Sequence, residues 1–326
     1  ALTNDTVEVA KIKNLNPSLI NSLLKNVIRN RDKINKREID ETSIPVWLSK
    51  ALKKLKIDRN EFFKNVCKEP SLHLVFKDKK YTKTIIENNF TTTDISAFIK
   101  NKKKISDIEN YEKGQWWIQD LASMLPIYLC SEFKSKDILD MCSAPGGKAF
   151  QLLSSKNKVT LNDISSKRIK ILKKNLERLN FEGKITNCNA LDISEEKKFD
   201  VVILDSPCSG IGTIRRNPEI IFKSKQPNLN YLVSSQMKLL TKATKLLKKR
   251  GVLLYMVCSF IFDETKQIKA KFLNLNPKFS QHKFELNKKE QFKSFIDSDG
   301  DFFCIPNRYN NYMIDGFYAV KFIKND

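Results

Sequence analysis

The sequence is poor in several features that would assign it to a familiar class of protein. It holds nine glycines and ten arginines in 326 residues, and none of its seven cysteines form a CxxC pair. An odd number of cysteines with wide, irregular gaps argues against a disulfide framework and against a zinc site, so we expect reduced thiols and no metal. The longest apolar run, 251–262, is too short to cross a bilayer. We therefore expect a globular cytoplasmic protein that is not inserted in a membrane.

Positive charge is what the sequence has in excess. The 59 lysines and arginines outnumber the 37 acidic residues, which gives a formal net charge of +22. A polyanion such as RNA or DNA is a suitable partner, because each cation placed near a phosphate releases condensed counterions. However, 49 of the 59 cations are lysine, and a lysine bias can also arise from nucleotide composition and produce a merely solvated surface. The charge alone therefore leaves both interpretations open.

The chain is predicted to have three parts. Residues 1–42 read as helical, with Leu19, Leu23 and Val27 at helical spacing. Residues 43–118 mix a short helix at 45–55 with strand-like pieces, which predicts a small α+β subdomain. Residues 119–326 show short apolar runs that alternate with amphipathic helices, the pattern of βα units around a parallel sheet.

These apolar runs predict the strands and helices of the sheet region. The expected strands are 138–141, 159–161, 201–204 and 252–257, the expected helices are 149–153, 164–179, 229–247 and 268–275, and two final strands, 302–305 and 316–323, would form an antiparallel edge. In such an α/β sheet, ligands bind beyond the carboxyl ends of the strands. Most of the scarce glycines fall beside these ends, which indicates a backbone constraint there.

The first two strand ends predict a cofactor site. The segment 140–148 reads DMCSAPGGK, a strand, a tight turn and a helix start, and it matches neither the P-loop nor GxGxxG. Asp163 follows the second strand about 20 residues later, where a carboxylate can accept hydrogen bonds from both hydroxyls of a ribose. Taken singly, the first segment could be an ordinary βα turn and Asp163 a helix cap. Together they indicate a cofactor that contains adenosine.

The third and fourth strand ends each carry a cysteine followed by serine. Cys208 lies in DSPCSGIG at 205–212, with Arg215 and Arg216 close behind, and Cys258 ends the fourth strand. A single buried cysteine is usually a small apolar residue. Two cysteines at aligned strand ends instead predict reactive thiols.

These motifs resemble the Sun/RsmB family of RNA cytosine-5 methyltransferases. The similarity spans nearly the whole chain, from the helical start through Trp116–Asp120 to Asp315–Tyr318, and is most specific at 143–148, 205–210 and 215–220. The resemblance implies a Rossmann-like class I S-adenosylmethionine-dependent methyltransferase with a mostly parallel seven-stranded sheet. The residues expected to bind S-adenosylmethionine are Cys142, Ser143, Ala144, Pro145, Gly146, Gly147, Lys148, Asp163, Asn189 and Asp205.

The resemblance also implies partners and domains. It implies that the partner is RNA, either 16S ribosomal RNA or a small-subunit assembly intermediate, that residues 43–118 bind RNA, and that the chain acts as a monomer. Residues 1–42 would be what remains of a NusB-like RNA-binding domain. Two positions depart from the family pattern: Asn189 stands where an acid usually precedes alanine, and Val257 stands where threonine usually precedes the nucleophile.

The implied chemistry is covalent catalysis. Cys258 would attack carbon 6 of cytosine and Asp205 would hydrogen-bond ring nitrogen 3. Carbon 5 would then take the methyl group, and Cys208 would remove the proton so that Cys258 can leave. Lys148 would favour the Cys258 thiolate. Arg215 and Arg216 would grip flanking phosphates, unless they belong to a solvated turn.

Two other functions stay open at this point. One is a DNA cytosine-5 methyltransferase in which Cys208, the cysteine of a Pro-Cys dipeptide, is the nucleophile. The other is a catalytically idle RNA-binding factor of ribosome assembly that keeps the fold.

Overall fold

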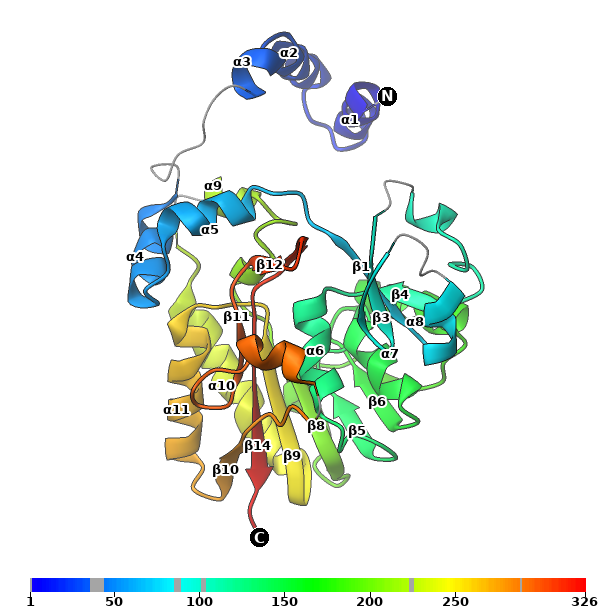
Figure 1. Cartoon of the computed structure of the whole chain (residues 1–326), viewed down its shortest axis with the longest axis vertical. Helices are drawn as coiled ribbons and strands as arrows, with labels where there is room; N and C mark the ends of the chain where they lie inside the picture. The colour runs from blue at the N-terminus through cyan, green and yellow to red at the C-terminus, as the bar shows by residue number, and fades with distance from the viewer. Residues whose placement is uncertain (1, 36–43, 85–88, 101–103, 223–225, 288) are drawn as a thin grey trace. The chain divides into compact units, whose positions relative to one another are not determined.

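The computed structural model describes residues 2–35, 44–84, 89–100, 104–222, 226–287 and 289–326, and it divides the chain into two compact units, Ala1–Ser43 and Ile44–Asp326 (Figure 1). The boundary predicted at residue 42 lies outside the described residues. Among the described helices, none combines the length and the apolar composition that a bilayer span requires.

The first unit consists of helices α1 (Leu2–Ile12), α2 (Pro17–Arg29) and α3 (Arg31–Asn35). Helix α2 begins where the Asn16 side chain accepts a hydrogen bond from the Leu19 amide at 3.1 Å. The helical character predicted for this segment is confirmed. The apolar stripe along α2 is more than half exposed, at 56% for Leu19 and Leu23. A NusB-like origin stays a prediction.

The second unit opens with the small α+β part. It contains α4 (Val46–Lys54), α5 (Arg59–Val66), the short 3-10 helices η2 (Lys79–Thr84) and η3 (Ile105–Asp107), and strands β1 (Leu72–Phe76), β2 (Phe90–Thr93), β3 (Ser96–Ile99) and β4 (Trp116–Ile118). The strands form an antiparallel sheet in the order β2-β3-β1-β4. Leu74, Phe76 and Trp116 are fully buried between the sheet and its neighbours. The α+β pattern is thus present, and its RNA-binding role stays a prediction.

The remainder of the second unit is built around a large sheet. Its helices are α6 (Leu121–Leu129), α7 (Gly147–Ser154), α8 (Ser166–Leu179), α9 (Glu219–Phe222), α10 (Leu229–Leu246) and α11 (Lys266–Leu275), with 3-10 turns η4 (Ala190–Asp192), η5 (Ile211–Thr213), η6 (Phe262–Glu264) and η7 (Glu290–Phe295). Its strands are β5 (Asp137–Asp140), β6 (Lys158–Asn162), β7 (Lys184–Thr186), β8 (Phe199–Asp205), β9 (Leu247–Val257), β10 (Phe279–His282), β11 (Phe302–Cys304), β12 (Asn307–Tyr309), β13 (Tyr312–Ile314) and β14 (Phe317–Lys324).

The strand order confirms the predicted α/β fold and corrects its edge. The order is β10-β14-β9-β8-β5-β6-β7, with β11 also paired to β14, so the sheet has eight strands where seven were predicted. Strands β9, β8, β5, β6 and β7 are parallel to one another, and β14 is antiparallel to both β9 and β10. The predicted strand at 316–323 is therefore interior, because β10 covers its outer side. Sequence reasoning missed β10 because Ser280, Gln281 and His282 give it no apolar run.

Two apolar layers cover the sheet. Along β8, Val201 and Ile203 face one layer while Val202 and Leu204 face the other, as the two-residue period of a strand requires. Helices α6, α7 and α8 pack in the first layer, and α10 and α11 pack in the second (Figure 1). Burial on both faces explains why β8 is an unbroken apolar run.

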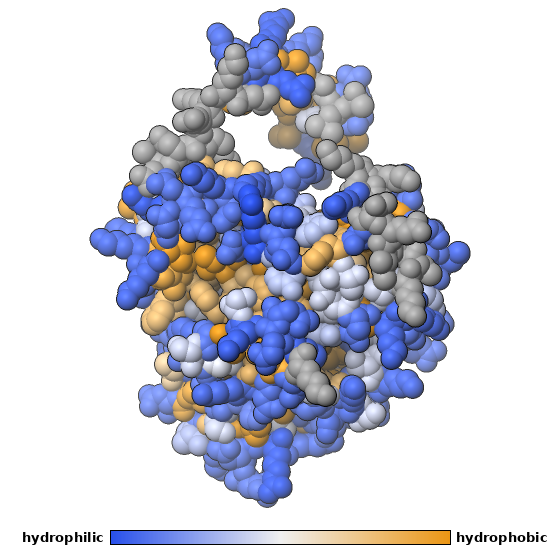
Figure 2. All heavy atoms as spheres, viewed as in Figure 1, coloured by the Kyte–Doolittle hydropathy of each residue, from blue (hydrophilic) through white to orange (hydrophobic). Residues whose placement is uncertain are grey.

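The face of this unit that Figure 2 shows carries many polar side chains. Figure 2 shows hydrophilic side chains over most of one face, with apolar side chains gathered below α5. This distribution is ordinary for a globular protein, so the functional site has to be sought at the strand ends and not in a surface patch.

Candidate active site

The carboxyl ends of β5, β6, β8 and β9 lie level with one another. In the sheet register, Asp140 pairs with Leu161 on one side and with Ile203 on the other, and Asp205 pairs with Met256. Every loop that was singled out in the sequence therefore leaves the sheet at the same edge, where α/β proteins bind their ligands.

The glycine loop after β5 is fixed by backbone geometry. Gly146 has φ +123° and precedes α7, and a Cβ atom on it would lie 2.2 Å from the ring of Phe150. The amide of Ser143 donates to the Asn162 carbonyl at 2.8 Å, and the amide of Ala144 donates to an Asp163 carboxylate oxygen at 3.3 Å. The loop is thus tied to the end of β6, and only glycine suits the position that turns it into the helix.

A cavity of about 340 Å³ opens beside these ends. Its volume is within the range of small-molecule sites. Of the predicted cofactor residues, Cys142, Asp163 and Asn189 line it, whereas residues 143–148 and Asp205 are not among its described lining residues. Of these residues, Lys148 and Asp205 pair with each other at 2.7 Å.

Asp163 is buried and already has several partners. One carboxylate oxygen accepts from the Ser165 amide at 2.8 Å and pairs with Arg168 at 2.9 Å, and the other accepts from Ala144. Arg168 is 48% exposed, so it can move away when a ligand approaches. Asn189 uses its side-chain oxygen to accept from the Leu191 amide at 3.1 Å.

Several lining residues were missed from the sequence. Arg168 lies on the first turn of α8, and Tyr231, Ser234, Ser235 and Lys238 lie along α10. The spacing of the four α10 residues, at 231, 234, 235 and 238, places them on one helical face, and this was the available signal. This spacing did not predict a binding site by itself, because a polar helix face usually means only solvent exposure.

The two strand-end cysteines meet. The Sγ atoms of Cys208 and Cys258 are 3.4 Å apart and form a hydrogen bond. This hydrogen bond, followed by burial, raises the pKa of the Cys208 thiol well above its usual value. Cys258 is only partly buried. The proximity predicted for these two thiols is therefore present in the structure.

Lys148 and Asp205 form an ion pair beside the thiols. The Lys148 ammonium lies 2.7 Å from an Asp205 carboxylate oxygen and 5.0 Å from the centre of the Phe317 ring. Burial lowers the pKa of Lys148, but the charges of Asp205 and Cys258 outweigh burial and the net pKa is raised. Lys148 therefore supplies positive charge close to Cys258.

Asp140, at the end of β5, is a further residue at these strand ends that the sequence motifs did not predict as functional. It is 1% exposed, and neither carboxylate oxygen has a hydrogen-bond partner among the described residues. Burial, followed by the nearby charge of Asp205, raises the pKa of Asp140 to about 7. A buried carboxyl group with a pKa near neutrality at a ligand-binding edge marks a functional position.

Gly212 joins the cysteine loops through the backbone. Its amide donates to the Cys258 carbonyl at 3.0 Å, and its carbonyl accepts from the Gly316 amide at 2.8 Å. A Cβ atom at Gly212 would lie 2.0 Å from the Gly316 carbonyl oxygen. This close approach is the physical reason for glycine at that position.

The structure corrects the role of Arg215. Its side chain is 5% exposed and donates to the backbone carbonyls of Asn65 (3.0 Å), Asn307 (2.9 Å) and Ile314, so it has no exposed guanidinium with which to grip a phosphate. It joins α5 to the β12–β13 hairpin instead. Arg216 pairs with Asp120 at 3.0 Å and Asp315 at 2.9 Å and is 33% exposed.

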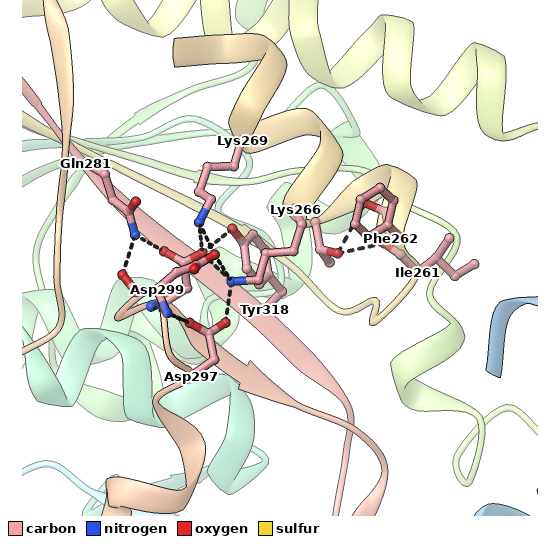
Figure 3. A network of polar contacts seen from close by, with 10 residues as sticks. Ile261, Phe262, Lys266, Lys269, Gln281, Asp297, Asp299 and Tyr318 are labelled. Carbon is pink, nitrogen blue, oxygen red and sulfur yellow. Dashed lines mark hydrogen bonds and ion pairs between the residues drawn. The ribbon is translucent and has the colours of Figure 1, made fainter. Parts of the chain in front are cut away.

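A cluster of three aspartates resembles a cation site but is already paired with two lysines. The carboxylates of Asp297, Asp299 and Asp301 lie within 4.8 Å of one another. Figure 3 shows that Lys266 and Lys269 of α11 point into the cluster. The Lys269 ammonium lies 2.7 Å from Asp301 and 2.9 Å from Asp299, and Lys266 contacts all three carboxylates. Two lysines therefore occupy the place that a metal would take.

Solved structures of similar fold support the same fold class. The crystal structure of PH0851 superimposes with a TM-score of 0.78 at 22% identity, covering 94% of this chain and 73% of that one. The crystal structure of NSun6 from Pyrococcus horikoshii with SFG gives a TM-score of 0.70 at 16% identity, covering 86% of this chain and 97% of that one. The predicted class I methyltransferase fold is confirmed.

Curated relatives and a family model agree on one family. The ribosomal RNA small subunit methyltransferase B of Photorhabdus laumondii is 34% identical over 174 residues, 52% of this chain and 41% of the relative. The probable enzyme of the same name from Bacillus subtilis is 28% identical, covering 68% of this chain and 51% of the relative. The chain thus spans about half the length of these relatives. The model of 16S rRNA methyltransferase RsmB/F matches residues 128–323. Because this match covers more than half of the chain, the chain belongs to the 16S rRNA methyltransferase RsmB/F family.

Proposed function

We propose that this chain transfers a methyl group from S-adenosylmethionine to carbon 5 of a cytosine in 16S ribosomal RNA through a covalent Cys258 adduct. The observation that carries the proposal is the pair of thiols, 3.4 Å apart, beside the Lys148–Asp205 ion pair at the strand ends. Family membership supports RNA as the substrate class.

The residues around the cavity fit the cofactor. A buried carboxylate, Asp163, lines a cavity of about 340 Å³ together with the Asn189 amide and the apolar side chains of Ile164 and Leu191. A carboxylate suits ribose hydroxyls and apolar walls suit a purine. S-adenosylmethionine supplies an electrophilic methyl group on a sulfonium. Pro207, next to Cys208, lines the same cavity, which supports a cofactor bound beside the thiols.

The side chains divide the steps of the reaction. The Cys258 thiolate forms a bond to carbon 6, and the electron pair of the 5,6 double bond moves into the ring, where Asp205, sharing a proton with Lys148, hydrogen-bonds ring nitrogen 3. Carbon 5 would use that electron pair to bond to the methyl carbon, and the sulfur of S-adenosylmethionine would keep the electrons of the bond that breaks. Once the Cys258 sulfur is bonded to carbon 6, its negative charge no longer opposes ionisation of Cys208, which releases its proton to solvent. The Cys208 thiolate then takes the proton from carbon 5, and the electrons left behind re-form the double bond as Cys258 leaves as a thiolate.

The environments of the two thiols favour this division of roles. The raised pKa of Cys208 disfavours its thiolate, while Lys148 lies close to Cys258. A nucleophilic cysteine needs a positive neighbour. The position of Lys148 close to Cys258 speaks for Cys258 as the nucleophile, and against the DNA-type mechanism in which Cys208 is the nucleophile. The presence of both thiols at one site speaks against a catalytically idle assembly factor.

Methyl transfer to defined transcripts tests the proposal. The protein is incubated with labelled S-adenosylmethionine and with 16S ribosomal RNA or the same sequence as DNA, and the nucleosides are separated after nuclease digestion. We expect labelled 5-methylcytidine from the RNA and no labelled product from the DNA. Label in 5-methyldeoxycytidine alone, or binding of RNA without any transfer, would support one of the two alternatives. Action as a monomer in the cytoplasm also stays a prediction.

A further inference from the structure

Glu264, at the end of η6, lies between the two cysteine loops. It is fully buried. Its Oε2 atom accepts hydrogen bonds from the hydroxyl groups of Ser209 at 2.5 Å and Ser259 at 2.6 Å, and its Oε1 atom accepts from the Ser209 amide at 2.9 Å. Ser209 directly follows Cys208, and Ser259 directly follows Cys258. A single carboxylate therefore holds both loops.

A third element is held by the same group. The amide nitrogen of Gln236, on α10, donates to Oε1 of Glu264 at 3.0 Å and to the Pro207 carbonyl at 3.0 Å. Glu264 thus accepts hydrogen bonds from four donors, all of them uncharged. Burial of a carboxylate without a cation costs stability, and apolar residues fill such positions more favourably. The four hydrogen bonds offset this cost and connect the two cysteine loops and α10 through one side chain.

Glu264 is itself held in place. The phenol of Tyr255, on β9, donates to the Glu264 carbonyl at 3.0 Å, and the Ile261 amide donates to the Ser259 hydroxyl at 3.2 Å. The segment from β9 to η6 therefore folds back so that the carboxylate meets both serines. This arrangement fixes the position of each cysteine relative to the other.

We propose that Glu264 is a positioning residue that sets the distance between the Cys208 and Cys258 thiols. This inference rests on the proposed function, in which the two thiols act on neighbouring atoms of one pyrimidine ring. Glu264 does not contact the substrate; it acts through Ser209 and Ser259. Its negative charge has a second effect, because it adds to the hydrogen bond with Cys258 and to burial in raising the pKa of Cys208.

The first test measures thiol proximity without any RNA. The oxidant diamide takes two electrons and two protons from a thiol pair, which becomes a disulfide, and peptide mapping follows the Cys208–Cys258 disulfide over time. We expect Glu264→Ala to slow this reaction about tenfold or more. Glu264→Gln keeps the shape and part of the hydrogen bonding, so its rate should fall between Glu264→Ala and the wild type. The matched control is Asp263→Asn, which removes the neighbouring carboxylate from a partly exposed site and should react like the wild type.

The second test separates positioning from ligand binding. Glu264 is not among the residues that line the cavity. We therefore expect Glu264→Ala to lower kcat for methyl transfer about 100-fold, the effect of a displacement of about 1 Å, with little change in KM for S-adenosylmethionine. Glu264→Gln should recover part of kcat. Circular dichroism melting curves establish whether each variant is folded.

The outcomes distinguish this inference from the proposed function. Disulfide formation in Glu264→Ala and Glu264→Gln at the rate of Asp263→Asn would overturn the positioning role even if the wild type methylates RNA. Slower disulfide formation together with a wild type that methylates no RNA would overturn the proposed function and leave the positioning role standing. If Glu264→Ala does not fold, the rate of Glu264→Gln decides.

Discussion

Neighbouring groups give the two active-site sulfur atoms different chemical properties. Cys208 is held by a hydrogen bond to Cys258 and by burial, both of which favour its protonated form. Cys258 lies near the Lys148 ammonium, whose charge is anchored by Asp205 at 2.7 Å. A single thiol could not serve as both nucleophile and proton acceptor in one turnover, so the proposed reaction requires two thiols at one site.

Lys148 provides a test of this division. Replacement by methionine removes the positive neighbour of Cys258, which disfavours the thiolate. We expect the rate of methyl transfer to fall at least about tenfold and the rising limb of its pH profile to move to higher pH. Lys148→Arg keeps the charge and should shift the profile less. An unchanged profile in Lys148→Met would contradict the role of this ammonium.

At the residue scale, the sequence predicted the reacting groups better than the groups that support them. Cys208 and Cys258 could be found because each follows a short apolar strand and precedes serine. Glu264 and Tyr231 could not be found, because their partners are distant in the chain or lie on a helix face without a distinctive pattern. Arg215 was misread because only the tertiary structure shows that three backbone carbonyls surround it.

At the scale of elements, a buried histidine joins the small sheet to the start of α6. The His73 ring, on β1, contacts the Gln119 carbonyl at 2.7 Å and the Thr92 hydroxyl at 2.9 Å. Burial lowers the pKa of His73 to about 4. The unfolded chain binds a proton at His73 at a higher pH than the folded chain does. The contribution of His73 to the free energy of unfolding is therefore complete above about pH 6.5 and falls progressively as the pH falls toward about 4.

His73 therefore predicts a pH-dependent loss of stability. Between pH 7.5 and pH 5, it should account for about 2 kcal/mol of the decrease in the free energy of unfolding. The measurement is urea denaturation of the wild type and of His73→Gln at both pH values. The decrease in the free energy of unfolding between the two pH values should be smaller in His73→Gln by about 2 kcal/mol. Equal decreases in the two proteins would contradict the assignment of this pH dependence to His73.

The lysine–aspartate cluster predicts a second stability effect. Asp301 is 1% exposed and accepts hydrogen bonds from Lys266, Lys269, Gln281 and the Tyr318 phenol (Figure 3). Asp301→Ala leaves buried lysines with fewer partners and should cost about 3 kcal/mol in the free energy of unfolding. Asp299→Asn alters a group that is 51% exposed and should cost less than about 1 kcal/mol. Denaturant titration measures the free energy of unfolding of both variants. Equal losses would contradict the expectation that the buried carboxylate of Asp301 contributes more than the exposed one of Asp299.

The strands and helices with strong apolar patterns were predictable from the sequence. The central β8 and the helices α8 and α10 were found because burial on two faces or on one face leaves a regular record in the residues. Strand β10 and the interior position of β14 were missed. Their pairing depends on contacts between distant segments, Phe279 with Lys324 for example, and no local pattern records it.

At the scale of the whole molecule, membership of an rRNA methyltransferase family favours the interpretation that the net charge of +22 serves RNA binding. The sequence alone left this charge open between a nucleic-acid surface and a solvated one. RNA binding that depends on it should release counterions and therefore weaken as salt is added.

Salt titration tests that dependence. For about five phosphate contacts on a single strand, the association constant should fall about 100-fold between about 50 mM and about 200 mM salt. Fluorescence anisotropy with a labelled RNA provides the measurement. An association constant that is independent of salt would mean that the lysines are only solvated surface.

The most direct test of the central claim is covalent trapping on RNA that carries 5-fluorocytosine. Fluorine at carbon 5 blocks the proton removal assigned to Cys208, so the adduct should accumulate when S-adenosylmethionine is present and appear as a shifted band on a denaturing gel. We expect the adduct with the wild type and with Cys208→Ala, and no adduct with Cys258→Ala. An adduct that is lost in Cys208→Ala and kept in Cys258→Ala would contradict the assignment of Cys258 as the nucleophile.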